Sequence, residues 1–421
     1  MDSISGNGIV NVRDHGVKCD GTTDDAAAIR ALFTKTNYRG LYFPGNCALG
    51  SALGTPAPGQ VLYGTFESAN SHAANNLAYS AVIDPTKFLR TPGQDGTTFI
   101  KNYSDGNITN APFLTLGTNN GVKGISFYDA SQAKVGQTGT PTANAPTIRM
   151  IEGMNAFIKS CEFLNSYFAI DVVGMWRPTI TDVVGQPYYI GLQVDKCYDV
   201  ARLTGIHWET YWDAYNYGGG YFTCPWSASN GYGYIIKRTD LLNAISCFVY
   251  GMQFGFVIDS NAGTSADSPW ALFMQCNADV CQRAVYINYT QQYGVRFINS
   301  TFTGGNPVIT ANSTFSGDAA FDSCYLLGSN SPVLVHNGTG TVSLTNCTID
   351  DINVSPTAAS IQQTAGRLIA TGNNWKRAQS QATLSAGIAA ALITGNLFKT
   401  TQTITNNATA GTYSITNNLA I

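Results

Sequence analysis

A short pattern repeats through the second half of the chain. A run of apolar residues ends at Cys, Asn or Ser, one polar residue follows, and an apolar residue comes next. The equivalent position, which we term the reference position, recurs at intervals of 24, 24, 23, 26 and 23 residues: Cys276, Ser300, Cys324, Cys347, Asn373 and Asn396. A fixed period of this length, with only short strands in each unit, is typical of a solenoid.

The repeats contain β-type segments and no helical spacing. After each reference position comes a turn rich in Gly, Asn and Asp, and then a second short apolar strand, at 284–287, 307–309 and 332–335. Leucine-rich and ankyrin-type arrays are therefore not expected. One coil cannot bury its inner face alone, whereas stacked coils share a continuous core. The sequence predicts an all-β fold, a parallel β-helix whose regular coils occupy 148–421.

The composition limits the partners of the protein. Only 12% of its 421 residues are charged, the formal net charge is −3, and no block of basic residues is present. Nucleic acid and anionic membrane are therefore not expected as partners. No apolar run approaches the ~20 residues of a membrane span. Neutral and acidic sugars both remain open as ligands.

Cysteine usage also follows the repeat. Five of the ten cysteines fall at the reference position: Cys161, Cys247, Cys276, Cys324 and Cys347. We expect these five to form a buried column of free thiols that act as small apolar side chains. No Cys or His cluster has the spacing of a zinc site, so no metal and no cofactor is predicted.

The N-terminal residues 1–50 predict a strand at 9–12 and a short helix that Thr23 or Asp24 caps. The apolar side of this helix is Ala28, Ile29, Leu32 and Phe33. The run NVRDHGVKCDGTTDDAAAIRAL, followed by GLYFPGNCAL, resembles the opening of pectate-lyase-superfamily proteins, a group rich in phage tailspikes. This resemblance implies a right-handed β-helix closed by the helix at its N-terminal end. It also implies a homotrimer on a virion tail or in another extracellular setting.

The rest of the chain divides into two further parts. Residues 51–147 show weaker periodicity, with strands expected at 61–66, 113–116 and 124–127, and are interpreted as irregular early coils with loops. Residues 148–421 form the regular coils, interrupted once by an aromatic insertion at 207–233. The segments on either side of the insertion, CYDVARLTGIHWETYW and GYGYIIKRTDLLNAISCFVYG, are also similar to phage tailspikes and related bacterial β-helix proteins.

Stacking predicts which carboxylates meet. The reference positions before Cys276 are taken as Cys161, Asp182, Ile206 and Cys247. Three residues after each reference position, the column reads Leu164, Gly185, Glu209, Tyr250, Asp279, Thr303, Leu327 and Asp350. Glu209 and Asp279 are then two coils apart, roughly 9–10 Å between backbones. An inverting glycosidase needs its carboxyl groups ~6.5–9.5 Å apart, so this pair fits inversion better than retention.

These residues predict a polysaccharide-cleaving site. The catalytic candidates are Glu209 and Asp279, with Asp213 of the insertion as a third carboxylate. The candidate substrate-binding residues are Trp208, Tyr211, Trp212, Trp226, Tyr250 and Arg283, because aromatic faces stack on sugar rings and Arg binds carboxylates or hydroxyls.

Three functions remain open at this point. The first is an endo-acting glycoside hydrolase that, as the tailspike resemblance implies, cleaves a bacterial capsule or O-antigen polysaccharide. The second is a polysaccharide lyase on the same scaffold, for which a base such as Lys, Arg or Tyr is needed. The third is a non-catalytic carbohydrate-binding adhesin or structural tail protein.

Overall fold

The chain forms two compact units of parallel β-coils. The computed structural model describes residues 8–66, 96–132, 139–209, 224–329, 332–351, 359–376 and 380–420. The first unit is Met1–Gln193 with Val200–Ser227, and the second is Val194–Asp199 with Ala228–Ile421. Each unit is described here by itself. The predicted parts 1–50, 51–147 and 148–421 stay a prediction.

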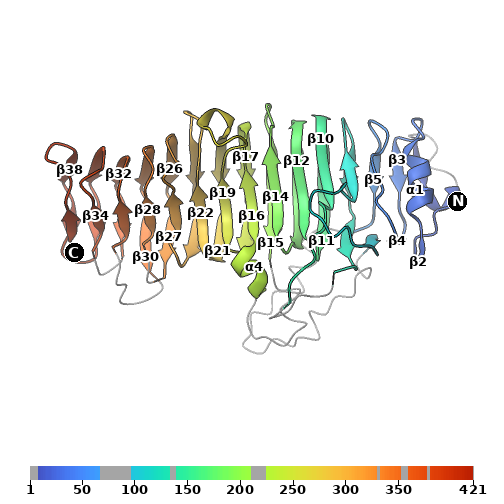
Figure 1. The fold of residues 1–421 in the computed structure, drawn as a ribbon, viewed down its shortest axis with the longest axis horizontal. Coiled ribbons are helices and arrows are strands. Elements are labelled where there is room, and N and C mark those ends of the chain that lie inside the picture. Colours follow the sequence, from blue (N-terminus) through green and yellow to red (C-terminus); the bar gives the residue numbers. More distant parts are fainter. Residues whose placement is uncertain are drawn as a thin grey trace. The chain divides into compact units, whose positions relative to one another are not determined.

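In the first unit, successive coils pair their strands in parallel in two sheets (Figure 1). Sheet A receives two arms from each coil, and sheet B receives one. The first arms are β1 (Ile9–Asn11), β3 (Gly40–Tyr42), β5 (Val61–Tyr63) and β8 (Gly121–Lys123). The second arms are β2 (Asp20–Asp24), β4 (Asn46–Leu49), β6 (Thr98–Lys101) and β9 (Ser126–Asp129). Three strands run through both arms: β11 (Phe157–Leu164), β13 (Thr179–Gln186) and β15 (Arg202–Trp208). Sheet B contains β7 (Leu114–Leu116), β10 (Ile148–Met154), β12 (Phe168–Trp176) and β14 (Ile190–Asp195), the last of which reaches into the second unit.

The second unit repeats this plan. Its first arms are β17 (Thr239–Ile245), β20 (Pro269–Met274), β23 (Val295–Ile298), β26 (Asp318–Asp322), β29 (Thr341–Thr345), β32 (Arg367–Thr371), β35 (Ala390–Thr394) and β38 (Tyr413–Thr416). Its second arms are β18 (Phe248–Tyr250), β21 (Asn277–Cys281), β24 (Thr301–Gly304), β27 (Tyr325–Gly328), β30 (Thr348–Asp351), β33 (Asn374–Trp375), β36 (Leu397–Phe398) and β39 (Leu419–Ala420). Sheet B contains β16 (Tyr232–Ile236), β19 (Phe254–Ile258), β22 (Arg283–Ile287), β25 (Ile309–Ala311), β28 (Leu334–His336), β31 (Ile361–Gln363), β34 (Ala382–Leu384) and β37 (Ile404–Asn406).

A residue in the left-handed backbone region separates the two arms of each regular coil. These kink residues have φ between 50° and 70°: Gly124, Ser160, Asp182, Gly205, Ser246, Gln275, Asn299, Ser323, Asn346, Gly372, Gly395 and Asn417. Gly and Asn are the residues that adopt this region at least cost, and five of the twelve kink residues are neither. The reference position is the residue that directly follows the kink, which explains why the pattern recurs in every coil.

Side chains at the reference position satisfy the backbone that the kink exposes. The amide of Cys347 donates to Oδ1 of Asn373 in the next coil at 2.8 Å, and the amide of Asn373 donates to Oδ1 of Asn396 at 2.9 Å. Ser300 accepts from the amide of Cys276 in the same way, at 3.1 Å. A buried amide without a partner is costly, so small polar side chains are favoured at this inward-facing position. The five cysteines predicted as buried free thiols are confirmed.

Large apolar side chains fill the interior between the sheets. In the first unit the rings of Phe99, Phe127 and Phe163 follow one another on paired strands, with centroids 5.7 and 5.1 Å apart. In the second unit Phe273 and Phe297 stack at 4.4 Å, and Phe321 continues the column. Burial of such rings supplies the main driving force for each coil.

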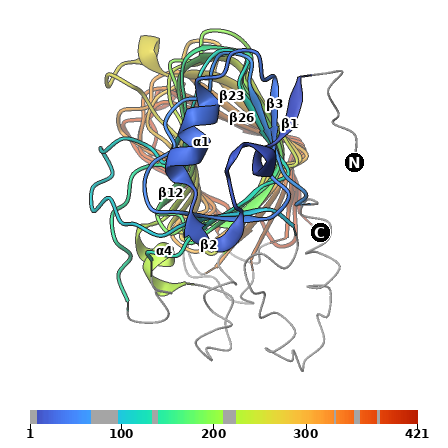
Figure 2. The same ribbon diagram turned by 90° about the vertical axis from the view of Figure 1, so that its right-hand side faces the viewer.

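The predicted N-terminal helix is confirmed as α1 (Ala26–Phe33), which buries Ile29, Leu32 and Phe33. Seen along the coils, it lies across part of the opening that the first strands surround (Figure 2). The N-cap residue is Asp25 and not Thr23 or Asp24 as predicted, although Asp24 accepts a hydrogen bond from the amide of Ala26 at 3.1 Å. A 3₁₀ turn, Val12–His15, replaces the end of the strand expected at 9–12.

One register prediction is wrong. Cys161 pairs with Val183, and Val183 pairs with Ile206, so the reference position of that coil is Val183 and not Asp182. The residue that shares its column with Leu164 is accordingly Gln186, not Gly185. Tyr250 pairs with Asp279 as predicted, and Thr303 pairs with Leu327.

The helices of the described chain are short. Besides α1 they comprise α4 (Pro225–Asn230) and the 3₁₀ turns Val12–His15 and Ser265–Asp267. Among the described residues, no helix combines the length and the apolar character required to cross a membrane.

Candidate functional site

Glu209 stands immediately after β15, on the outer face of sheet A in the first unit. Its amide donates to the carbonyl of Gly185 at 3.0 Å, which extends the β13–β15 ladder by one residue. Its carboxylate forms a close hydrogen bond with Nε2 of His207, and both side chains are partly exposed, 26% and 44%. A carboxylate paired with an imidazole that solvent can reach is suited to proton transfer.

A second carboxylate in the same unit was not predicted from the sequence. Glu162 on β11 is only 4% exposed, and it accepts a hydrogen bond from the Ser126 hydroxyl at 2.5 Å. Strand pairing places Ser126, Glu162, Val184 and His207 in one column. Glu162 and His207 are therefore two strand spacings apart, roughly 9–10 Å between backbones. The sequence contained a signal for this column. Glu162 and His207 each directly follow a reference position, Cys161 and Ile206.

An aromatic cluster lies at the corner that follows the ends of these strands. Tyr167 and Tyr189 stack with their centroids 5.0 Å apart, and the Trp226 ring lies 5.9 and 6.0 Å from them. All three side chains are partly exposed. Burial raises the pKa of Tyr167, and the Tyr189 hydroxyl adds to this effect. We name Tyr167, Tyr189 and Trp226 the aromatic corner. Of its members, only Trp226 was predicted.

Trp208, a predicted substrate-stacking residue, is fully buried. Strand alternation directs Ile206 and Trp208 inward and places His207 and Glu209 outside. The indole meets the ring of Phe163 in the core, with centroids 6.2 Å apart. This burial does not suit a sugar-binding platform. Three other predicted residues of the insertion, Tyr211, Trp212 and Asp213, lie outside the described residues.

Asp279 lies on β21 in the second unit. Its Oδ1 accepts a close hydrogen bond from the hydroxyl of Thr303, and the same hydroxyl accepts from the amide of Val280 at 3.0 Å. Tyr250 is its strand partner on the preceding coil, and both side chains are half-buried. Glu209 and Asp279 belong to different units, so their predicted proximity stays a prediction.

Arg283 begins β22 in sheet B, whereas Asp279 is in sheet A. Its guanidinium carbon lies 5.6 Å from the centroid of Phe254 and 5.8 Å from that of Tyr286. Stacked on two rings, it remains able to donate to a ligand through the edge of the guanidinium.

A groove of about 410 Å³ opens on the outer face of the first arms of β11, β13 and β15. It is lined by Asn155, Phe157, Ile158, Lys159, Arg177, Thr179, Thr181 and Arg202. None of these residues was predicted as part of a site. All of them belong to the first unit.

The described residues contain one group with the ligand types of a metal site: Cys19, Asp25 and Cys47. The two cysteines form a disulfide, and the Asp25 carboxylate accepts from the amides of Lys18 and Cys19, each at 2.7 Å. Their donor atoms are thus committed to holding the N-terminal turn, and we propose no metal there.

Comparisons with known proteins bear on the fold. No protein-family model matches the chain, and no curated protein sequence matches it. Among solved structures, DFA-IIIase from Arthrobacter chlorophenolicus A6 is similar with a TM-score of 0.54 and 10% identity, over 98% of each chain. The A-module of mannuronan C-5 epimerase AlgE4 from Azotobacter vinelandii gives a TM-score of 0.50 and 13% identity, over 97% of this chain and 95% of that one. Tailspike protein 3 of bacteriophage CBA120 gives 0.50 and 11% over 98% of this chain, which spans 61% of the tailspike.

These similarities confirm the predicted fold. The chain has a right-handed parallel β-helix of the pectate-lyase-like type with a short N-terminal helix. At identities of 10–13%, they establish the fold alone.

Proposed function

On the premise of a right-handed parallel β-helix, we propose that this protein acts on a polysaccharide, as an endo-acting glycoside hydrolase. The observation that carries the proposal is the partly exposed Glu209–His207 pair at the end of β15, in the unit that also contains the aromatic corner. A carboxylic acid beside a surface of stacked aromatic rings is the combination by which sugars are bound and their glycosidic bonds protonated.

In this proposal Glu209 is the general acid, and His207 holds its carboxyl group in place. A second carboxylate activates the water that attacks the sugar from the opposite face. Asp279 and Asp213 are the candidates for that role from the sequence. Glu162 is a further candidate, because it occupies the same face of the same unit as His207.

The sugar-binding surface is proposed to combine the aromatic corner with residues of the insertion. Tyr167, Tyr189 and Trp226 supply a cluster of partly exposed aromatic rings. Tyr211 and Trp212 stay proposed stacking residues, as do Tyr250 and Arg283 in the second unit. Trp208 is proposed instead as the core support of the strand that carries His207 and Glu209.

We propose a bacterial capsule or O-antigen polysaccharide as the substrate, and a homotrimer in an extracellular or virion-tail setting. The structural likeness to a phage tailspike protein supports this setting through the shared fold. The likeness to a mannuronan epimerase module shows that such coils also serve enzymes named for polysaccharide substrates. The low content of charged residues is compatible with a surface that binds sugars through hydroxyl and aromatic groups.

The test is incubation of the full chain with a panel of purified capsular and O-antigen polysaccharides. A rise in reducing ends with a fall in polymer size supports the hydrolase. A rise in ultraviolet absorbance from an unsaturated sugar would replace hydrolysis by the lyase mechanism. Retained binding without any change in size would identify a carbohydrate-binding adhesin, and absence of binding to every polymer would refute the proposal.

A further inference from the structure

Exposed aromatic side chains gather where the first arms of the second unit begin. Tyr293 is 57% exposed and Tyr198 is 48% exposed, the highest values among the aromatic residues that the structure describes. Trp270 is partly exposed, and its ring centroid lies 4.7 Å from that of Tyr293. All three residues belong to the second unit. Large apolar side chains gathered at the surface in this way mark a binding site.

Strand register places Tyr198 and Trp270 on either side of Asp240. Each of these three residues directly follows a member of one parallel ladder, and the members are Cys197, Thr239 and Pro269. The ladder members are buried, so the side chains that follow them face out of the sheet. Neighbouring strands are roughly 4.8 Å apart. The carboxylate of Asp240 therefore lies between two outward-facing aromatic side chains.

A β-bulge shapes the middle of this surface. The register of β17 against β20 shifts between Thr239 and Leu242, so Asp240 and Leu241 both stand opposite Trp270. Leu241 has a φ of 53°, in the left-handed region that a bulky residue rarely adopts, and its side chain is exposed. Bulges re-aim side chains and recur beside functional sites, where local backbone strain also concentrates.

The Asp240 carboxylate is held by its neighbours. The Arg238 guanidinium forms a close hydrogen bond with Oδ1 and a second one with Oδ2 at 3.3 Å. Nε2 of Gln291 also donates to Oδ1, at 2.9 Å. Burial acts to raise the pKa of Asp240, but the hydrogen bonds from Arg238 and Gln291 outweigh it and lower the pKa. The carboxylate, 33% exposed, is thus an ionised and oriented acceptor for hydroxyl groups.

The charges around this carboxylate balance. The segments 195–199 and 237–240 carry three bases and three acids: Lys196, Lys237, Arg238, Asp195, Asp199 and Asp240. Burial raises the pKa of Asp195, and the charges of Lys237 and Lys196 oppose this shift, so both cations act on that carboxyl group. Arg238 is engaged with Asp240. A surface without net charge does not attract an acidic ligand and suits a neutral one.

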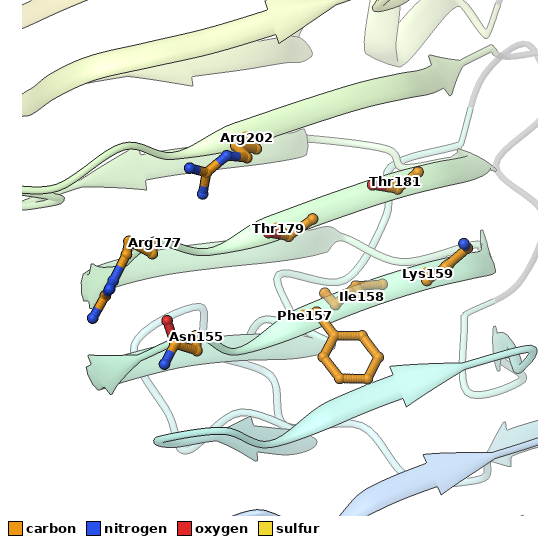
Figure 3. A pocket seen from close by; sticks show the side chains of 8 residues that line it. All are labelled: Asn155, Phe157, Ile158, Lys159, Arg177, Thr179, Thr181 and Arg202. Carbon is orange, nitrogen blue, oxygen red and sulfur yellow. The ribbon is translucent and has the colours of Figure 1, made fainter.

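We infer that Tyr198, Asp240, Trp270 and Tyr293 form a second carbohydrate-binding site, which takes neutral sugar units and retains the polysaccharide on the protein. Trp270 and Tyr293 stack on one sugar unit and Tyr198 on another, while Asp240 accepts from the hydroxyl groups between them. The site shares no residue with the groove of the first unit, whose lining Figure 3 shows. The inference rests on the proposed function, because it takes the polysaccharide as the ligand.

The experiment measures the affinity of the full chain for dextran, mannan, galactan and laminarin, and for the purified capsular and O-antigen polysaccharides, by affinity electrophoresis. At least one neutral polymer is expected to bind, with an affinity that added salt does not change. Trp270→Ala and Tyr198→Ala are each expected to lower that affinity about tenfold, whereas Trp270→Phe keeps an aromatic face and most of the affinity. The matched control is Trp176→Ala on β12, a tryptophan that is 45% exposed in the first unit, and it is expected to bind as the parent does.

The outcomes separate the two proposals. Unchanged affinity in both alanine variants, or binding confined to acidic polymers, would overturn the second site and leave the proposed function standing. A changed oligomeric state of Trp270→Ala in light scattering, with polymer binding intact, would identify a subunit contact and also overturn the site. Binding that the variants weaken, in a parent protein that cleaves no polymer, would support the site and refute the hydrolase. Absence of binding to every polymer would remove both proposals.

Discussion

The ring of Trp208 meets the ring of Phe163 edge to face, although β11 and β15 both pair with β13 and not with each other. Gly185 is the residue between them in register. Because it has no side chain, the two rings reach across an intervening strand and make contact. This contact supports the strand that carries His207 and Glu209 on its opposite face.

Gly185→Ala is expected to destabilise the protein by about 1–3 kcal/mol. An added Cβ would stand 2.2 Å from the backbone carbonyl oxygen of Phe163, where only movement of the strand relieves the clash. Urea unfolding followed by tryptophan fluorescence measures the change. Gly305→Ala is the control, because nothing lies within 4 Å of the corresponding Cβ. Equal stability of the two variants would contradict the role assigned to Gly185.

Asn396→Ala is expected to cost about 3 kcal/mol of unfolding free energy. Oδ1 of Asn396 accepts from both the amide and the side chain of Asn373, each at 2.9 Å, and its Nδ2 donates to the Ala370 carbonyl at 2.9 Å. Truncation removes the acceptor of the buried Asn373 amide and the donor to the Ala370 carbonyl, whereas Nδ2 of Asn373 keeps its bond to the Leu344 carbonyl. Thermal and urea unfolding measure the loss, and exposed Asn407→Ala is the control. A variant as stable as that control would show that the side-chain ladder is dispensable.

Glu209→Gln is expected to lower kcat on a cleaved polysaccharide by roughly 10²–10⁴-fold without unfolding the protein. Glutamine keeps the shape and the contact with His207 but cannot deliver a proton. Reducing-end assays measure the rate, and circular dichroism checks the fold. The same change at exposed Glu152 is the control. Full activity of Glu209→Gln would refute the assignment of the general acid.

The identity of the second carboxylate is decided by comparing Glu162→Gln with Asp279→Asn. Each removes one charge and keeps the side-chain volume. If one variant loses activity and added azide restores product as a glycosyl azide, the residue substituted in that variant is the carboxylate that activates water. If both variants keep full activity, the candidate that remains is Asp213.

His336 makes stability depend on pH. It is fully buried, and burial lowers its pKa from the usual 6.5, partly offset by hydrogen bonds with backbone groups. Below about pH 6.5 the unfolded chain therefore binds a proton that the folded chain does not. The unfolding free energy is expected to fall as the pH decreases from about 6.5 through the lower pKa of the folded state. Above pH 6.5 this residue adds no pH dependence.

The measurement is a series of urea titrations between pH 5 and 8 on the parent protein and on His336→Gln. The variant is expected to lose part of the decline below pH 6.5. Exposed His15→Gln is the control and should retain the decline of the parent. Identical pH profiles of the parent and His336→Gln would contradict this origin.

The repeat itself could be predicted because the kink imposes a local chemical requirement in every coil. Where the reference residue is Cys, Ser or Asn, as from Cys247 onward, the predicted register agrees with the structure. The error at Asp182 arose because kink residues are also small and polar. In that coil the kink is Asp182 and the reference residue is Val183, so the polar residue alone does not tell the two positions apart.

The candidate site could be predicted only in part, for physical reasons. Alternation counted from Ile206 would have placed Trp208 inside and Glu209 outside. The alignment of Tyr167 with Tyr189 depends on the correct register at Val183, whereas Glu162 and His207 each follow a reference residue that was assigned correctly. The groove brings together Lys159, Arg177 and Arg202 from three coils, and Arg177 is a turn residue with φ of 53° that follows no strand pattern.

The side chain that completes the kink of one coil comes from the coil that follows, as Asn373 does for Cys347 and Asn396 for Asn373. The stack of coils therefore has a direction, because the hydrogen bonds at the kink of each coil are completed by the next coil along the chain. Residues can therefore be inserted into or deleted from the β-helix only as complete coils, with the junction just before a kink residue. A partial turn would leave a backbone donor stranded in the interior, whereas extra residues at an outer bend would not.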